Sequence, residues 1–279
     1  MEKYDLLPKQ LMYDGTCIQE DFFVPKPIDL SIIERVHEPE YIKKLRTLTL
    51  NKSEARKIGF PLSKELVERE IIIAGGTIQG SMKAFETGIA MNIAGGTHHA
   101  FKGHGEAFCL LNDQAIAAQY LLDKKLVDRI LIVDLDVHQG NGTAEIFQSN
   151  PNVFTFSMHG QKNYPFHKEQ SDLDIALEDD CNDADFLRIL KKVLPGLIAK
   201  TRPDFIFYLC GVDVLKTDKL GRLGLTVAGC KQRDVFVLEL CKKNNIPVQC
   251  SMGGGYSKEI KVIVDAHANT FRAAKHIFD

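Results

Sequence analysis

The chain has 279 residues, of which 44% are hydrophobic and 26% charged, a composition typical of a globular protein with a large buried core. The formal net charge is −2, so we expect neither nucleic acid nor an anionic membrane surface as a partner. No apolar stretch is long enough to span a bilayer, and residues 1–10 lack the apolar core of a signal peptide.

Five short apolar runs predict β-strands. In chain order they are Ile89–Ile93, Ile130–Val137, Val153–Met158, Phe205–Cys210 and Val248–Met252. Most of these runs are uniformly apolar and do not alternate with polar residues. That pattern is typical of strands in a parallel sheet, which are covered on both faces.

The stretches beside these runs predict helices. They are Ser63–Thr87, Asp113–Leu126, Asp183–Ala199, Thr226–Asn244 and Ser257–Phe278. We expect the first helix to be interrupted near Gly75 and Gly76, and we predict Asp183 and Thr226 as N-caps. The alternation of strands and helices predicts one α/β domain over residues 1–279.

The seven cysteines are irregularly spaced and form no C-x-x-C motif. This spacing favours neither a disulfide framework nor a cysteine zinc site. We therefore predict free thiols and a cytoplasmic location.

A polar cluster follows the second apolar run, where Asp134, Asp136 and His138 occupy every second position. The period of a strand places such residues on one side. Burying two carboxylates beside an imidazole is costly unless a cation compensates their charge, so the pattern favours a divalent metal. A catalytic zinc needs three protein ligands and one open position. Asp136 and His138 supply two, and Asp213, which follows another apolar run, is the best third candidate.

Two further motifs follow strand ends. His98 and His99 come after a glycine pair, and adjacent histidines can supply the base and the acid that amide hydrolysis needs. Three glycines precede Tyr256, and they allow the backbone to approach a ligand closely. The Tyr256 hydroxyl can donate a hydrogen bond to a developing oxyanion.

These motifs, taken together and in this order, resemble the zinc-dependent histone deacetylase family. The resemblance covers nearly the whole chain, and residues 138–142 look most like class IV and its bacterial relatives. It implies the arginase/deacetylase fold, a three-layer α/β/α domain around a mostly parallel sheet of about eight strands. It also implies an amidohydrolase that removes acetyl or longer acyl groups from acylated lysine or a related small amine, using a metal-activated water.

The resemblance implies a role for each motif residue. Asp136, His138 and Asp213 would bind Zn²⁺, although an Asp₂His site also accepts Fe²⁺. His99 would act as general base and then acid. His98 would assist through Asp134, and Tyr256 would stabilise the oxyanion. Further implied residues are Phe108, Tyr164 and Gly254 in the substrate site, Asn141 beside the second histidine, and Asp134, Ser157 and Met158 around a structural K⁺.

The chain departs from many relatives at two places. Asn141 stands where they carry an aspartate, so we expect His99 to have a lower pKa here. Relatives also carry a strand and a loop before the segment that resembles residues 1–4. Two explanations stay open: the true start lies upstream, or the protein has lost this N-terminal element, in which case folding and activity would be affected.

Two other functions remain open from the residues themselves. One is a ureohydrolase-like enzyme with two manganese ions, which would need further bridging carboxylates. The other is a non-catalytic scaffold that keeps the fold. The sequence predicts no oligomeric state.

Overall fold

A computed structural model describes residues 2–279, so Met1, in the N-terminal segment discussed above, lies outside the described residues. The elements, in chain order, are α1 (Lys3–Tyr13), a 3₁₀ turn η1 (Gln19–Asp21), α2 (Leu30–Ile33), α3 (Pro39–Thr47), α4 (Lys52–Ile58), α5 (Lys64–Thr87), β1 (Ile89–Asn92), α6 (Asp113–Asp123), β2 (Ile130–Asp134), α7 (Asn141–Phe147), β3 (Val153–Gly160), β4 (Leu173–Leu177), α8 (Asp183–Thr201), β5 (Phe205–Leu209), α9 (Val227–Lys243), β6 (Val248–Ser251) and α10 (Ile260–Phe278).

The strands form one parallel sheet in the order β1-β6-β5-β2-β3-β4. All five apolar runs are strands, as predicted. The expectation of about eight strands was too high, because the sheet has six over residues 2–279 and everything described before β1 is helix or loop. Strand β4 was missed because this edge strand is only partly buried and its short apolar pattern is weak.

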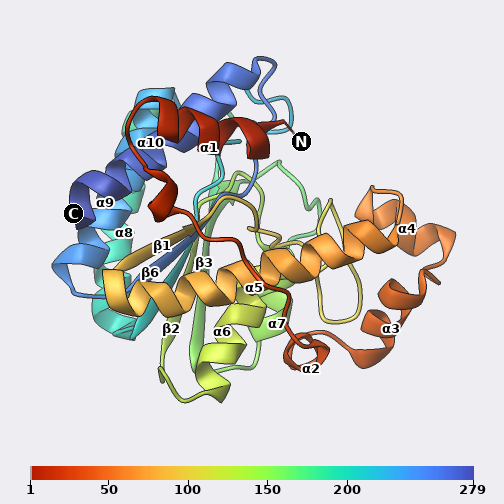
Figure 1. Cartoon of the computed structure of the whole chain (residues 1–279). Helices are drawn as coiled ribbons and strands as arrows, with labels where there is room; N and C mark the ends of the chain where they lie inside the picture. Colours follow the sequence, from red (N-terminus) through yellow and green to blue (C-terminus); the bar gives the residue numbers. More distant parts are fainter. Residues whose placement is uncertain (1) are drawn as a thin grey trace.

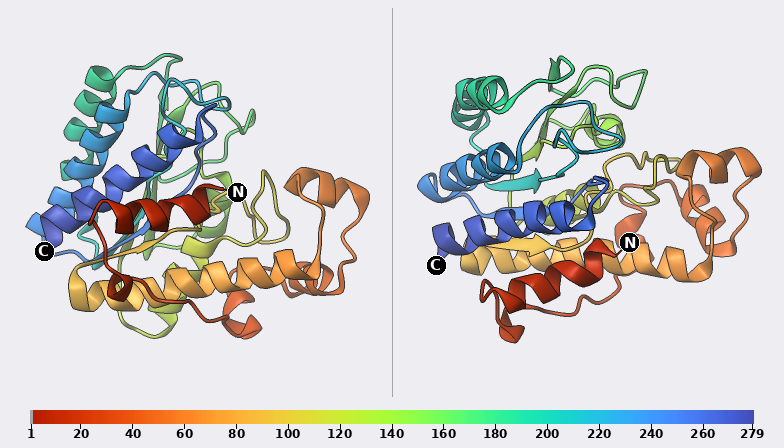
Figure 2. Two further views of the ribbon diagram at one scale, coloured as in Figure 1. Left: turned by 45° about the horizontal axis from the view of Figure 1, so that its top comes forward. Right: turned by 90° about the horizontal axis from the view of Figure 1, so that it is seen from above.

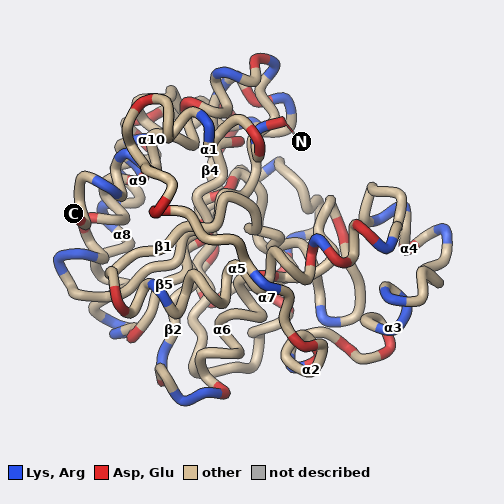
Figure 3. Tube along the Cα trace, in the orientation of Figure 1, with Lys and Arg blue, Asp and Glu red and all other residues tan. Residues whose placement is uncertain are grey.

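The sheet separates two hydrophobic cores, which confirms the three-layer architecture (Figures 1 and 2). Leu131 and Val133 of β2 point into a core shared with α8, α9 and α10, whereas Ile130 and Ile132 point into one shared with α3, α5 and α6. Helix α1 packs against α10 through a third, smaller cluster that includes Leu7. Lys, Arg, Asp and Glu gather on the outer helices and loops and are sparse along the strands (Figure 3).

Helix α5 runs through Gly75 and Gly76 without interruption, contrary to our expectation. Both glycines are buried under the segment that leads into α2. A Cβ at position 75 would lie 2.1 Å from the carbonyl oxygen of Lys26. The glycines therefore serve close packing and do not end the helix.

The helix caps were predicted with one error. The Thr226 side chain caps α9, as expected, but α8 is capped by Asn182 and not by Asp183. The Asp183 carboxylate accepts hydrogen bonds from the Thr226 backbone and hydroxyl, and so joins the starts of the two helices.

Candidate active site and metal centre

The predicted site residues converge at the carboxyl ends of the central strands, where ligands bind in parallel α/β folds. Most of them line one cavity of about 890 Å³, which includes Phe108 and Tyr164, whereas Asp134, Asn141, Ser157 and Met158 lie behind its wall and are not part of the lining. Strand β2 ends at Asp134, so Asp136 and His138 lie in the following bend and not on the strand, as their alternate spacing had suggested. Asp136 is nevertheless buried, as is Asp134 at the end of the strand.

Asp136, His138 and Asp213 offer three ligand atoms that lie within 4.8 Å of one another. His138 Nδ1 is 3.0 Å from Asp136 Oδ1 and 3.3 Å from Asp213 Oδ2. Burial disfavours a charged imidazole, but the two carboxylates outweigh it and raise the pKa of His138 to about 10. The cluster therefore attracts positive charge.

The glycine loop after β6 encloses this cluster. The Gly254 amide donates to Asp136 Oδ2 at 3.0 Å, and a Cβ on Gly254 would collide with Asp213 Oδ2. That oxygen is buried and accepts no hydrogen bond, which is costly without a compensating partner. An Asp₂His donor set with one orphaned carboxylate oxygen fits a divalent transition metal.

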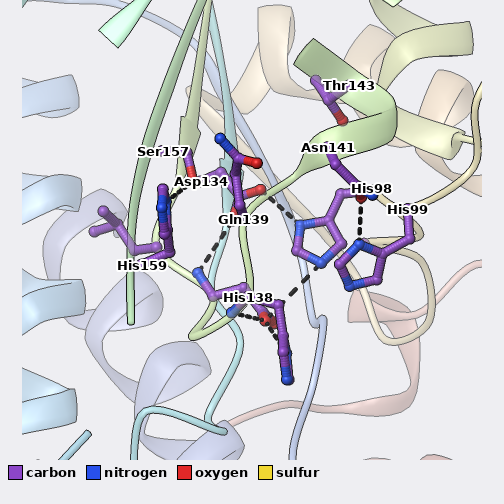
Figure 4. A network of polar contacts seen from close by, with 12 residues as sticks. His98, His99, Asp134, His138, Gln139, Asn141, Thr143, Ser157 and His159 are labelled. Carbon is purple, nitrogen blue, oxygen red and sulfur yellow. Dashed lines mark hydrogen bonds and ion pairs between the residues drawn. The ribbon is translucent and has the colours of Figure 1, made fainter. Parts of the chain in front are cut away.

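Asp134 turns away from this cluster and pairs with His98, whose Nδ1 lies 2.6 Å from Asp134 Oδ2 (Figure 4). Burial lowers the pKa of His98, but the carboxylate and its hydrogen bond outweigh burial, and the net shift is upward. This histidine can therefore carry a proton.

His99 lies beside His98, with ring centroids 4.1 Å apart, and its Nδ1 is 2.6 Å from Asn141 Oδ1 (Figure 4). The amide oxygen accepts only, so Nδ1 carries the hydrogen and Nε2 keeps a free lone pair. Burial, together with the nearby imidazoles of His98 and His138, holds the pKa of His99 well below its usual value. A neutral ring with a free lone pair can accept a proton.

The predicted aromatic residues also line this cavity. The Tyr164 ring contacts His99 edge-on at 5.1 Å between centroids, and its hydroxyl donates to Glu106. The ring centroids of Tyr256 and Phe108 are 6.4 Å apart. Burial, followed by the Asp213 charge, raises the pKa of Tyr256, so its hydroxyl stays a hydrogen-bond donor at neutral pH.

Asp134 and Ser157 are paired residues of β2 and β3, and Met158 follows on β3. The Ser157 hydroxyl bonds to His159 Nδ1 at 2.9 Å, while Asp134 Oδ1 accepts the Asp136 amide at 3.1 Å (Figure 4). The three residues predicted around potassium are thus neighbours.

The cavity is also lined by charged residues that the sequence analysis did not identify, among them Lys3, Arg69 and Glu70. The sequence did contain a signal for Glu70. Val67, Glu70 and Ala74 recur at helical spacing, and all three are buried. The helical periodicity of the sequence would therefore have predicted a buried acidic residue here, and such a residue is a candidate for function.

Comparison with known proteins identifies the family. Residues 1–271 match the histone deacetylase domain. The chain belongs to the histone deacetylase family. Fission yeast (Schizosaccharomyces pombe) histone deacetylase clr6 is 33% identical over 80% of this chain and 59% of its own length. An uncharacterised protein of the cyanobacterium Picosynechococcus is 45% identical over 100% of this chain and 93% of its own length.

Solved structures of this family share the fold. The HDA15 HD domain superposes with a TM-score of 0.83 at 21% identity, covering 99% of this chain and 81% of that domain. An HDAC homologue from Aquifex aeolicus gives 0.82 at 24% identity, covering 96% and 77%. As in the sequence, no helix within residues 2–279 is long and apolar enough to cross a membrane.

Proposed function

We propose that the protein is a metal-dependent deacylase that hydrolyses the amide of an acylated lysine side chain or of a related acylated amine. One observation carries the proposal. Both histidines, Tyr256 and the three possible metal ligands line a single cavity. A hydrolase needs these groups within reach of the same amide.

Asp136, His138 and Asp213 would hold the metal, with Zn²⁺ as the first candidate and Fe²⁺ as the second. Such an ion supplies Lewis acidity to the acyl carbonyl and to water. His99 accepts the proton of the attacking water at its free Nε2 and returns it to the leaving amine. His98 with Asp134 supports the added positive charge, and Tyr256 donates to the oxyanion.

The aromatic side chains of Phe108 and Tyr164, together with the Gly254 backbone, would border the substrate. Asp134, Ser157 and the carbonyl oxygen of Met158 would hold potassium. The motif at residues 138–142 supports a class IV-like assignment, and the free cysteines suit a reducing cytoplasm.

The two alternative functions make different demands. A binuclear hydrolase needs carboxylates that bridge two metals, whereas residues 2–279 contain one cluster of three possible ligands. A scaffold needs no base and no oxyanion donor, whereas His99 and Tyr256, which would suit these roles, both line the cavity.

The test is to count metal per chain and to assay acetyl-, butyryl- and myristoyl-lysine peptides and acetylpolyamines. We expect one metal per chain, loss of metal in Asp213→Ala, and a roughly 100-fold or larger fall in kcat for Tyr256→Phe, as for other oxyanion donors. Tyr13→Phe is the control because Tyr13 is 89% exposed. Two metals per chain would favour the binuclear enzyme, and a folded, metal-loaded protein without turnover would favour the scaffold.

A further inference from the structure

The loop of residues 161–168, which follows β3, borders the cavity. It contributes four residues to the cavity lining: Lys162, Asn163, Tyr164 and Phe166. Within residues 2–279, no backbone amide of residues 164–168 donates a hydrogen bond to another backbone group. This part of the loop therefore lacks the backbone hydrogen bonds that hold a helix or a strand, and side chains must fix its shape.

One side chain of the loop supplies such contacts. The Lys168 ammonium reaches back across the loop and donates to three of its carbonyl oxygens. The acceptors are Gln161 at 3.1 Å, Asn163 at 2.8 Å and Pro165 at 2.6 Å. An ammonium group has three N–H donors, so each donor can be matched with one acceptor. Several carbonyl oxygens around one positive charge also form the kind of site in which a protein backbone binds a monovalent cation.

The Lys168 charge is used on these carbonyl groups and not in an ion pair. A surface lysine usually extends its ammonium into water, whereas Lys168 is half-buried. Burial outweighs the more distant charge of Asp174 and lowers the pKa of Lys168. Hydrogen bonds from a charged donor are about twice as strong as neutral ones, so these three contacts can hold the loop in one shape.

The loop is also held through the side chain of Tyr164. The Tyr164 hydroxyl donates to the carboxylate of Glu106. That carboxylate lies 3.2 Å from His104 Nε2 and 3.5 Å from Lys57 Nζ, so it is itself fixed. The hydroxyl of Tyr164 is thus held by Glu106, and its backbone is held by the loop around the Lys168 ammonium.

We propose that Lys168 is a positioning residue whose ammonium acts as a tethered monovalent cation within this loop. Lys168 does not line the cavity, so it acts on a substrate through Tyr164. Without the Lys168 side chain, the three carbonyl oxygens form a site for a small primary ammonium ion. The kinetic consequence rests on the proposed deacylase function, whereas the shape of the loop does not depend on it.

The kinetic experiment uses Lys168→Ala, which leaves a space that matches propylammonium in length. For the preferred acylated substrate, kcat/KM should fall roughly 10-fold, mainly through KM, because Tyr164 would border the bound substrate. Propylammonium chloride should restore most of the loss. Tetramethylammonium chloride carries the same charge but no N–H donor, so it should restore none.

Two further variants make this result specific to the ammonium. Lys168→Met keeps the apolar stem, so it should lose as much activity as Lys168→Ala without a response to propylammonium. It also decides the matter if Lys168→Ala does not fold. Lys192→Ala removes an exposed lysine of α8 and should match the wild type. Wild-type kinetics in Lys168→Met, or equal effects of the two ammonium salts on Lys168→Ala, would overturn the inference.

Limited proteolysis with chymotrypsin tests the loop without turnover. Phe166 is 84% exposed and offers a cleavage site within the loop. Cleavage after Phe166 should be roughly 10-fold faster in both Lys168 variants than in the wild type, and propylammonium should slow it in Lys168→Ala alone. If no acylated amine is hydrolysed, the deacylase proposal fails, while this cleavage pattern still supports the role of Lys168. Equal cleavage rates in the wild type and both variants overturn it.

Discussion

Two arginine–acid pairs, each formed by neighbouring residues of one helix, lie in different parts of the molecule. Arg233 and Asp234 of α9 are fully buried in the core. The Asp234 carboxylate accepts from Arg233, Tyr208 and Thr270. The Arg233 guanidinium also donates to the carbonyl oxygens of residues 135, 210 and 211, beside the segments that carry the possible metal ligands. By contrast, the cavity-lining pair of Arg69 and Glu70 has one internal hydrogen bond.

The difference is one of hydrogen-bond satisfaction. A fully buried ion pair with every donor and acceptor engaged fixes one structure, whereas a partly exposed pair with unused donors and acceptors can bind water or a ligand. We therefore interpret the α9 pair as a structural support of the strand ends, and the α5 pair as part of the wall of the cavity.

The largest effect should follow from breaking the core pair. Asp234→Ala leaves Arg233 buried and unpaired, so the free energy of unfolding should fall by about 3–5 kcal/mol. Urea unfolding at pH 7 measures it. Glu239→Ala changes an exposed acid of the same helix and should cost less than about 0.5 kcal/mol. Equal effects of the two variants would remove the contrast between the pairs.

The Arg69–Glu70 pair should make the free energy of unfolding depend on pH. The pKa of Glu70 is raised in the folded state, to about 7, so its proton stabilises the fold below about pH 4.5. That stabilisation is lost as the pH rises through about 7. Relative to Glu70→Gln, the wild-type free energy of unfolding should fall by about 3 kcal/mol between pH 4 and pH 8. A pH-independent difference would contradict the raised pKa, and Glu68→Gln should follow the wild type.

Lys3 is an intermediate case, a buried ammonium with one hydrogen bond, to the Gly253 carbonyl oxygen at 3.0 Å. Lys3→Met should loosen the glycine loop that positions Tyr256. We expect kcat to fall about 10-fold, with a smaller change in KM, and Lys3→Arg to restore most of it. Steady-state kinetics measure this, with Lys9→Met at an exposed position of α1 as the control. Equal kcat values for Lys3→Met and Lys9→Met would show that the hydrogen bond from Lys3 to Gly253 does not contribute.

The smallest effect should come from adding a charge where the protein has an amide. Asn141→Asp places a carboxylate at His99 Nδ1, which should raise the pKa of His99 because the negative charge stabilises the protonated ring. Because the base must be neutral, the acidic limb of the pH–kcat/KM profile should move up in pH. An unmoved limb would show that Asn141 only orients the ring.

The sequence predicted much of the fold because strands buried on both faces leave a strong local signal. All five apolar runs became strands, and the polar residues after them met at one end of the sheet. The catalytic roles of those residues stay predictions. The partly buried edge strand β4 lacks that signal. The glycines of α5 wrongly predicted a break in the helix, because their function is to allow close packing against residues 25–28.

The sequence by itself determined the alternation of strands and helices and the set of residues at the strand ends, because both follow from patterns a few residues long. Only the tertiary structure decided how Lys3 meets Gly253, 250 positions away, and which arginine–acid pair is satisfied. The reason is physical. Hydrogen-bond satisfaction and burial depend on groups brought together by folding, and no local pattern encodes their partners.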